Sequence, residues 1–273
     1  MSYKIQTRDK TQEKKKRNKM NPATIITNFN NSQLQTPPTS PVSFDKYYTY
    51  YNIQLEQSKL MPQPSKIKNG DPFTWSDIQF IIKSNQLEIF ARSRQQTIKY
   101  HKFKQWLKDN KLSINDYLLD YELHWKELEL REQQHELVSD KEYSIDYPED
   151  LIFHNPNDIS ILYNKFPYYF EPNVKHICIW SKLKIPVDKN SEVGDISVMT
   201  KKLINRYLEK TFVAKGISWD QIVWFKNWLS LQSVRSISHI HVILKDVDDK
   251  FVDELISGGS GEVLTLDDYR NLE

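Results

Sequence analysis

The sequence of 273 residues is long enough for one domain with additional tails, because domains usually span about 100–200 residues. A net charge of +2 excludes the strong global field of a nucleic-acid-binding domain, so nucleic acid is not an expected partner. The single cysteine, Cys178, excludes an intrachain disulfide and favours a reducing compartment. No apolar run approaches the roughly 20 residues of a membrane span. The first residues are charged and do not have the apolar character of a signal peptide. We therefore expect a cytoplasmic protein without membrane contact.

Composition divides the chain into three parts. Residues 1–65 are rich in Lys, Asn, Gln, Ser and Pro and are predicted to form a disordered basic and polar tail. The run Lys14–Arg17 in this tail could act as a nuclear-import patch, which makes the nucleus an alternative location. Residues 66–257 are predicted to form a single domain. Residues 258–273 are predicted to form a flexible acidic tail that begins with the glycine-rich stretch 258–261.

The first part of the predicted domain is helical. Thr74 is typical of an N-cap with acidic Asp77 three residues on, and a helix is expected through Lys83. A longer helix is predicted over residues 86–108. A third is predicted over residues 114–132, where apolar residues recur at three- and four-residue spacing.

The second part combines strands with helices. Strands are predicted at 174–180, 222–226 and 239–244, and helices at 195–211 and 246–256. A short helix is predicted from Pro156 to Tyr163. Ser218 and Gln221 could instead form a capping box, which is the main rival to the strand at 222–226. The predicted fold class is α+β, with an N-terminal helical part followed by an antiparallel sheet flanked by helices.

The stretch around residues 221–244 carries the clearest chemical signal. Side chains alternate between the two faces of a strand, so His239 and His241 share one face while Ile240, Val242 and Leu244 share the other. Histidine has the side chain that titrates nearest neutrality. Such a pair can bind an anion, transfer a proton, act as a nucleophile or hold a metal. The structural alternative is a hydrogen-bonded pair on a half-buried face.

Two resemblances follow from the order of the motifs. The first covers most of residues 71–257, and the chain resembles the fungal N-acetylglucosamine-induced protein family, whose biochemistry is open. It rests on the following segments: Pro72–Trp75, Leu87–Glu88, Arg92–Ser93, Phe166–Tyr168, His176–Lys182, Trp224–Asn227, Leu231–Val234 and His239–Val242. The resemblance implies a role connected with N-acetylglucosamine or nucleotide-sugar metabolism.

The second resemblance is local and concerns the site. From strand 174–180 to His239 and His241, the order of elements is similar to that of the histidine-triad superfamily, which includes hexose-1-phosphate uridylyltransferases. There a strand-borne histidine attacks phosphorus, and an upstream Gln/Ser stretch holds phosphate oxygens. Two registers fit this chain. In one, His239 is the nucleophile and Ile237 replaces the first histidine; in the other, His241 is the nucleophile and Ile243 replaces the third.

These observations give a set of candidate residues and three functions. The candidate catalytic residues are His239 and His241, and the candidate ligand-binding residues are Asn227, Gln232, Ser233, His176 and Lys182. The first function is a protein of N-acetylglucosamine or nucleotide-sugar metabolism that binds a nucleotide or amino sugar without a cofactor. The second is an active nucleotidyl transferase or hydrolase. The third is a hydrolase with zinc held by His176, His239 and His241.

Overall fold

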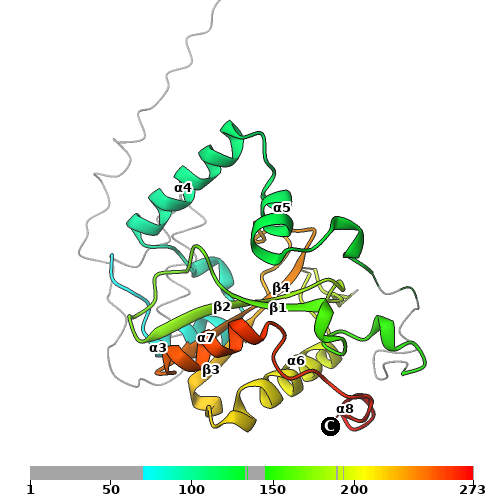
Figure 1. The fold of residues 1–273 in the computed structure, drawn as a ribbon. Helices are drawn as coiled ribbons and strands as arrows, with labels where there is room; N and C mark the ends of the chain where they lie inside the picture. The colour runs from blue at the N-terminus through cyan, green and yellow to red at the C-terminus, as the bar shows by residue number, and fades with distance from the viewer. Residues whose placement is uncertain (1–69, 133, 135–144, 189, 193, 273) are drawn as a thin grey trace, which may run out of the picture. The chain divides into compact units, whose positions relative to one another are not determined.

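A four-stranded antiparallel sheet lies at the centre of the part of the chain that the structure describes (Figure 1). The computed structural model describes residues 70–132, 134, 145–188, 190–192 and 194–272, and the predicted tail at 1–65 falls outside these ranges. The sheet has the order β1-β2-β4-β3. Its strands are β1 (Ile159–Tyr163), β2 (Val174–Ser181), β3 (Ile222–Phe225) and β4 (Ser238–Lys245). The predicted α+β class with an antiparallel sheet is confirmed.

Helices cover both faces of the sheet (Figure 1). They are α3 (Trp75–Lys83), α4 (Arg94–Asp109), α5 (Ile114–Tyr117), α6 (Val198–Thr211), α7 (Asp249–Gly258) and α8 (Leu266–Arg270). A π-helical turn at Leu118–Leu123 follows α5. Short 3₁₀ turns occur at Leu87–Ile89, Glu127–Glu129, Pro148–Asp150, Pro156–Asp158, Val213–Lys215 and Trp219–Gln221.

The helix caps expected from the sequence are present in the structure. Thr74 and Asp77 form the predicted capping box at the start of α3. Ser218 and Gln221 also form a capping box, but it closes only a 3₁₀ turn that leads directly into β3. The two rival predictions for this segment therefore describe consecutive elements, because one short turn satisfies the cap before the apolar strand begins.

The two faces of the sheet bury different kinds of side chain. On one face, Ile240, Val242 and Leu244 pack with α6, α7 and the C-terminal segment in the largest apolar cluster. On the other face two smaller clusters form, one around α3 with Ile243 and one around Trp180. The predicted alternation of β4 is confirmed. It places the histidines on the face that carries the two smaller clusters.

Several element boundaries differ from the predictions. A strand, β1, replaces most of the helix predicted over residues 156–163, because Ile159 and Ile161 alternate into the core beside β2. The helix predicted over 86–108 begins only at Arg94, since the preceding 3₁₀ turn packs against α3. The helix predicted over 114–132 ends at His124, which adopts a left-handed conformation with φ 54°.

The C-terminal segment is packed rather than free. Leu264 and Tyr269 are buried, and the Asp268 carboxylate pairs with Arg206 at 2.8 Å and Lys210 at 2.6 Å on α6. This differs from the expected flexible tail, because the acidic residues find basic partners on a neighbouring helix. Among the described residues, no helix has the length and apolar character needed to cross a membrane.

Candidate functional site

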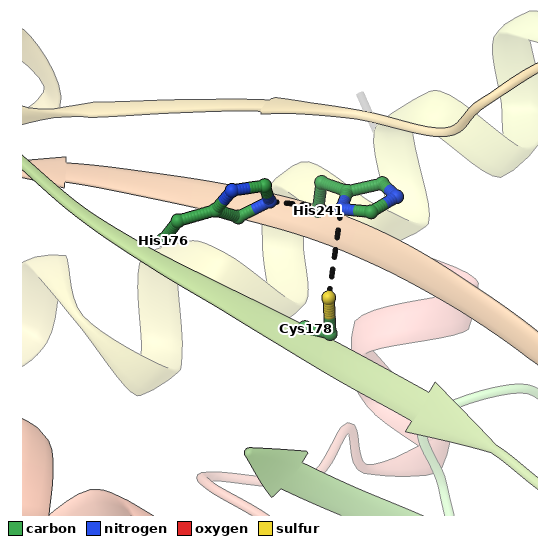
Figure 2. Close-up of side chains that lie close together, drawn as sticks. All are labelled: His176, Cys178 and His241. Carbon is green, nitrogen blue, oxygen red and sulfur yellow. Dashed lines mark hydrogen bonds between the residues drawn. The ribbon is translucent and has the colours of Figure 1, made fainter. Parts of the chain in front are cut away.

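The two central strands bring three histidines and the only cysteine to one face of the sheet. In the antiparallel register, Cys178 lies opposite His241 and Trp180 lies opposite His239. His176 lies two residues before Cys178 on β2 and reaches His241 diagonally, as Figure 2 shows. All three histidines are buried, with 4 to 8% of their surface exposed. The face of the sheet that carries the histidines is therefore buried.

A chain of hydrogen bonds links these rings. Asn164 Oδ1 accepts a hydrogen bond from the Phe166 amide at 3.0 Å, which turns its Nδ2 group toward His176 Nε2 at 3.1 Å. His176 Nε2 lies 2.9 Å from His241 Nδ1, and the Tyr168 amide donates to His176 Nδ1 at 3.5 Å. Neutral His176 has one proton for its two nitrogens, so its tautomer sets which of the two facing nitrogens donates. On the other side of the ring, His241 Nε2 lies 3.1 Å from Asn227 Nδ2. Both nitrogens of His241 are engaged.

Burial keeps the cluster uncharged at neutral pH. Desolvation, with a smaller contribution from the positive charge of Arg92, lowers the pKa of His176 to about 3. Desolvation also holds the pKa of His241 well below its ordinary value, with His176 as the next cause. Desolvation raises the pKa of the Cys178 thiol to about 12. The cluster therefore consists of neutral imidazoles and a neutral thiol.

His239 differs from the other two histidines. Its Nδ1 donates to the Ile237 carbonyl at 3.0 Å, and its ring lies 4.3 Å from the Trp180 ring. Desolvation lowers the pKa of His239 to about 4. Its Nε2 therefore keeps a lone pair at neutral pH, and no described residue hydrogen-bonds to it. This nitrogen can accept a proton, bind a ligand or act as a nucleophile.

A cavity of about 140 Å³ opens on the histidine face, and we call it the histidine cavity. The β-strand face supplies Cys178, Trp180, His239 and His241, and Asn227 follows β3. The opposing wall comes from α4, α5 and the segment between β1 and β2. It contains Tyr100, Phe103, Tyr117, Lys165, Phe166 and Tyr168. The cavity thus has a polar floor beneath a largely aromatic wall.

The residues predicted from the sequence fall into three groups. His239, His241, Asn227 and Ser233 line the cavity. His176 lies behind them, bonded to His241, and Gln232 acts indirectly by donating to the Asn227 carbonyl at 2.7 Å. Lys182 is not brought to the cavity. Its ammonium group pairs with Glu129 and lies 5.4 Å from the centre of the Trp125 ring.

Three residues that matter to the cavity were not among the predicted site residues. Arg92, Asn164 and Tyr168 all line it, and Tyr168 stacks on the His176 ring at 5.4 Å. The aromatic run around Tyr168 had the composition of a ring-binding platform, which was the available signal. Arg92 and Asn164 carry no such local signal, because only the fold brings them to the histidines.

A metal would use a different trio from the one predicted. Ligand atoms of His176, Cys178 and His241 lie within 4.8 Å of one another, whereas the sequence suggested His239 in place of Cys178. Two nitrogens bound to one tetrahedral zinc at about 2.0–2.1 Å would lie about 3.3 Å apart. The 2.9 Å between His176 Nε2 and His241 Nδ1 is instead an ordinary hydrogen-bond distance. An Asn164 N–H also points at this pair, so the arrangement favours a hydrogen-bond network.

Comparisons with known proteins place this chain among fungal relatives. The family described as "Protein of unknown function (DUF3605)" matches residues 74–245. N-acetylglucosamine-induced protein 1 of Candida albicans is 99% identical over 254 residues, which cover 93% of this chain and 100% of that protein. A Saccharomyces cerevisiae protein described as uncharacterized is 30% identical over 192 residues, which cover 70% of this chain and 88% of that protein.

One solved structure is also similar. The crystal structure of HTC1 superposes with a TM-score of 0.52 and 29% sequence identity, covering 71% of this chain and 100% of that chain. The first predicted resemblance, to the N-acetylglucosamine-induced family, is confirmed. None of these relatives carries a histidine-triad description, so that likeness stays a hypothesis about the site.

Proposed function

The chain belongs to the family described as protein of unknown function (DUF3605), and we propose that this protein binds a nucleotide or nucleotide sugar in the histidine cavity. One observation carries the proposal: the unpaired Nε2 of His239 lies at a cavity that is otherwise walled by aromatic rings. The printed name of the Candida albicans relative connects that protein with N-acetylglucosamine, which supports an amino-sugar conjugate as the ligand.

The dimensions and the wall of the cavity suit a ring. An apolar cavity of about 150 Å³ holds benzene in other proteins, and the histidine cavity measures about 140 Å³. Its wall contains aromatic side chains, among them Tyr100, Phe103 and Phe166, and such rings can pack against a base or against the apolar face of a sugar. A nucleotide sugar would place one ring here and extend the rest of the molecule through the mouth.

Calorimetric titration tests this proposal. UDP-N-acetylglucosamine, UMP, N-acetylglucosamine and zinc are titrated into the wild-type protein and into His239→Gln. The matched control is His101→Gln, because His101 is exposed on α4 and does not line the cavity. We expect nucleotide binding in the wild type and the control, and loss of binding in His239→Gln. Stoichiometric zinc binding with no nucleotide heat would favour the metal-dependent hydrolase instead.

A second candidate function is nucleotidyl transfer through His239. The observation that favours it is the anchoring of Nδ1–H on the Ile237 carbonyl, which directs a neutral Nε2 lone pair away from the backbone. Nε2 would attack the α-phosphorus of a UDP-sugar, forming an N–P bond while the P–O bond to the sugar phosphate breaks. Water would then attack the same phosphorus and release UMP and a proton. In this reaction the first register applies, with His239 as nucleophile and His241 as its support.

Intact-protein mass spectrometry separates binding from transfer. Incubation with UDP-N-acetylglucosamine followed by rapid acid quench should give a mass gain of one uridylyl group if transfer occurs. The gain should vanish in His239→Gln and persist, at a lower rate, in His241→Gln. Binding without any adduct would restrict the function to recognition.

A further inference from the structure

Arg92 is held rigidly at the wall of the histidine cavity. It lies just before Ser93, the N-cap of α4, and its Nε donates to the Phe166 carbonyl at 2.8 Å. Its guanidinium carbon lies 4.6 Å from the centre of the Tyr100 ring and 5.6 Å from that of Tyr168. One hydrogen bond and two aromatic faces therefore fix the plane of the guanidinium group.

The charge of Arg92 is not neutralised by the residues around it. Within the described ranges, its terminal amino groups have no hydrogen-bond acceptor and no carboxylate partner. Glu122 also lines the cavity, but its carboxylate is bonded to the Lys165 ammonium and to the Tyr117 hydroxyl. The lowered pKa values of His176 and His241 include a contribution from Arg92, so its field reaches the cavity floor.

A second atom in the same cavity also lacks a partner. Asn227 is 5% exposed, and its Nδ2 donates to His241 and to the Tyr168 hydroxyl at 3.3 Å. Its Oδ1 has no hydrogen-bond partner in the part of the chain that the structure describes. Buried polar atoms are usually paired, so an orphaned acceptor beside a cavity indicates a missing donor. A ligand with both an oxyanion and a hydroxyl or N–H group would satisfy Arg92 and Asn227 together.

We propose that Arg92 is the anion-binding residue of this cavity and that the ligand is a phosphate ester of a ring-bearing metabolite. This inference rests on the proposed function and specifies its ligand class. The planar guanidinium fork can make two parallel hydrogen bonds to phosphate oxygens, and its rigid position lowers the ordering cost of doing so. Hydrogen bonds to charged groups of this kind typically change affinity about tenfold to a hundredfold.

The test compares ligands with and without phosphate. UMP, uridine and inorganic pyrophosphate are titrated by calorimetry into the wild type, Arg92→Gln and Arg92→Lys. The matched control is Arg235→Gln, because Arg235 is exposed and lies outside the cavity. Far-UV circular dichroism and thermal melting confirm that each variant is folded.

We expect Arg92→Gln to bind UMP about tenfold to a hundredfold more weakly than the wild type while uridine binding is unchanged. Arg92→Lys should retain part of the UMP affinity, since it keeps the charge but loses the fork. Arg235→Gln should behave as the wild type. Equal losses for UMP and uridine, or no loss for either, would overturn the assignment of Arg92.

Two further outcomes separate this inference from the proposed function. Pyrophosphate binding that disappears in Arg92→Gln, with no binding of UMP or uridine to the wild type, would support the anion site and reject the nucleotide. If Arg92→Gln does not fold, the comparison of UMP and uridine binding to the wild type tests the inference. Equal affinities for UMP and uridine there would overturn the inference without any variant.

Discussion

Replacing His239 and His241 by glutamine should affect stability very differently, although the two residues lie on one face of β4. His241 bonds through both nitrogens, and its ring stacks on Phe225 with centroids 4.8 Å apart and an interplanar angle of 13°. Glutamine cannot reproduce the two bonds and the stack together. Losing buried hydrogen bonds costs about 1–3 kcal/mol and losing the stack about 0.5–1.5 kcal/mol. We expect His241→Gln to lose about 2–4 kcal/mol of unfolding free energy.

His239 should be far more tolerant. Its one hydrogen bond goes to the nearby Ile237 carbonyl, and its Nε2 bonds to no described residue. A glutamine amide can also donate to a local carbonyl, so His239→Gln should cost about 1 kcal/mol. Val242→Ala supplies a core reference, because Val242 is fully buried on the opposite face. Removal of two methyl groups at about 0.8 kcal/mol each, plus a cavity term, gives about 2–3 kcal/mol.

Urea unfolding with a shared slope measures all three variants, and calorimetry with UDP-N-acetylglucosamine measures binding per folded molecule. The expected order of destabilisation places His239→Gln clearly below Val242→Ala, with His241→Gln at or above it. Binding should be lost in His239→Gln. A His239→Gln protein as unstable as Val242→Ala, with unchanged binding, would refute the assignment of an open Nε2 and make His239 a structural residue.

Three further predictions test other parts of the structure. Because the pKa of His239 falls from 6.5 to about 4 on folding, the unfolded state takes up the proton first, so stability should decrease as the pH falls from about 6.5 to 4. The expected loss of unfolding free energy is about 3 kcal/mol, from 1.36 kcal/mol per pKa unit. The stability of His239→Gln, measured by urea unfolding, should depend less on pH. Gly261→Ala should lower the melting temperature by several degrees, because Gly261 has a φ of +66° and a Cβ there would lie 2.7 Å from the Tyr207 hydroxyl. Gly258→Ala is the control and should not lower the melting temperature, because its Cβ would meet no atom within 4 Å. The Cys178 thiol, with a pKa of about 12, should react with a disulfide reagent at pH 8 only after denaturation, and fast reaction in the native state would contradict its burial.

The sequence predicted the central strands well because their signal is local. Alternation alone assigned the two faces of β4, and the run of apolar residues identified β2. The strand at Ile159–Tyr163 was missed because Pro156 and Asn157 favour a helix start, and only pairing with β2 makes the following residues extended. Tertiary contacts therefore decided the elements for which local propensity was ambiguous.

The site was predictable only in part, for a similar reason. His239, His241 and Asn227 lie close in sequence, so one hairpin-like region was enough to group them. Arg92 comes from the helical part more than a hundred residues earlier, and its orientation depends on the Phe166 carbonyl. Nothing in the local sequence specifies that long-range contact. The sequence left open whether the two histidines were exposed or half-buried, and it could not specify their full burial because the elements that cover them are equally distant in sequence.

The pattern of satisfied and unsatisfied groups gives the best argument that this cluster has a function. Burying polar side chains on a sheet face is costly unless each group is paired, and apolar residues would pack there without that cost. His176 and His241 are fully engaged in the network. The exceptions are the Nε2 of His239, the Oδ1 of Asn227 and the amino groups of Arg92. Buried atoms without a described partner also occur away from the cavity, at Gln86 and Ser181 for example. What distinguishes the histidine cavity is that three groups without a partner among the described residues meet there, as the polar contacts of a bound ligand require.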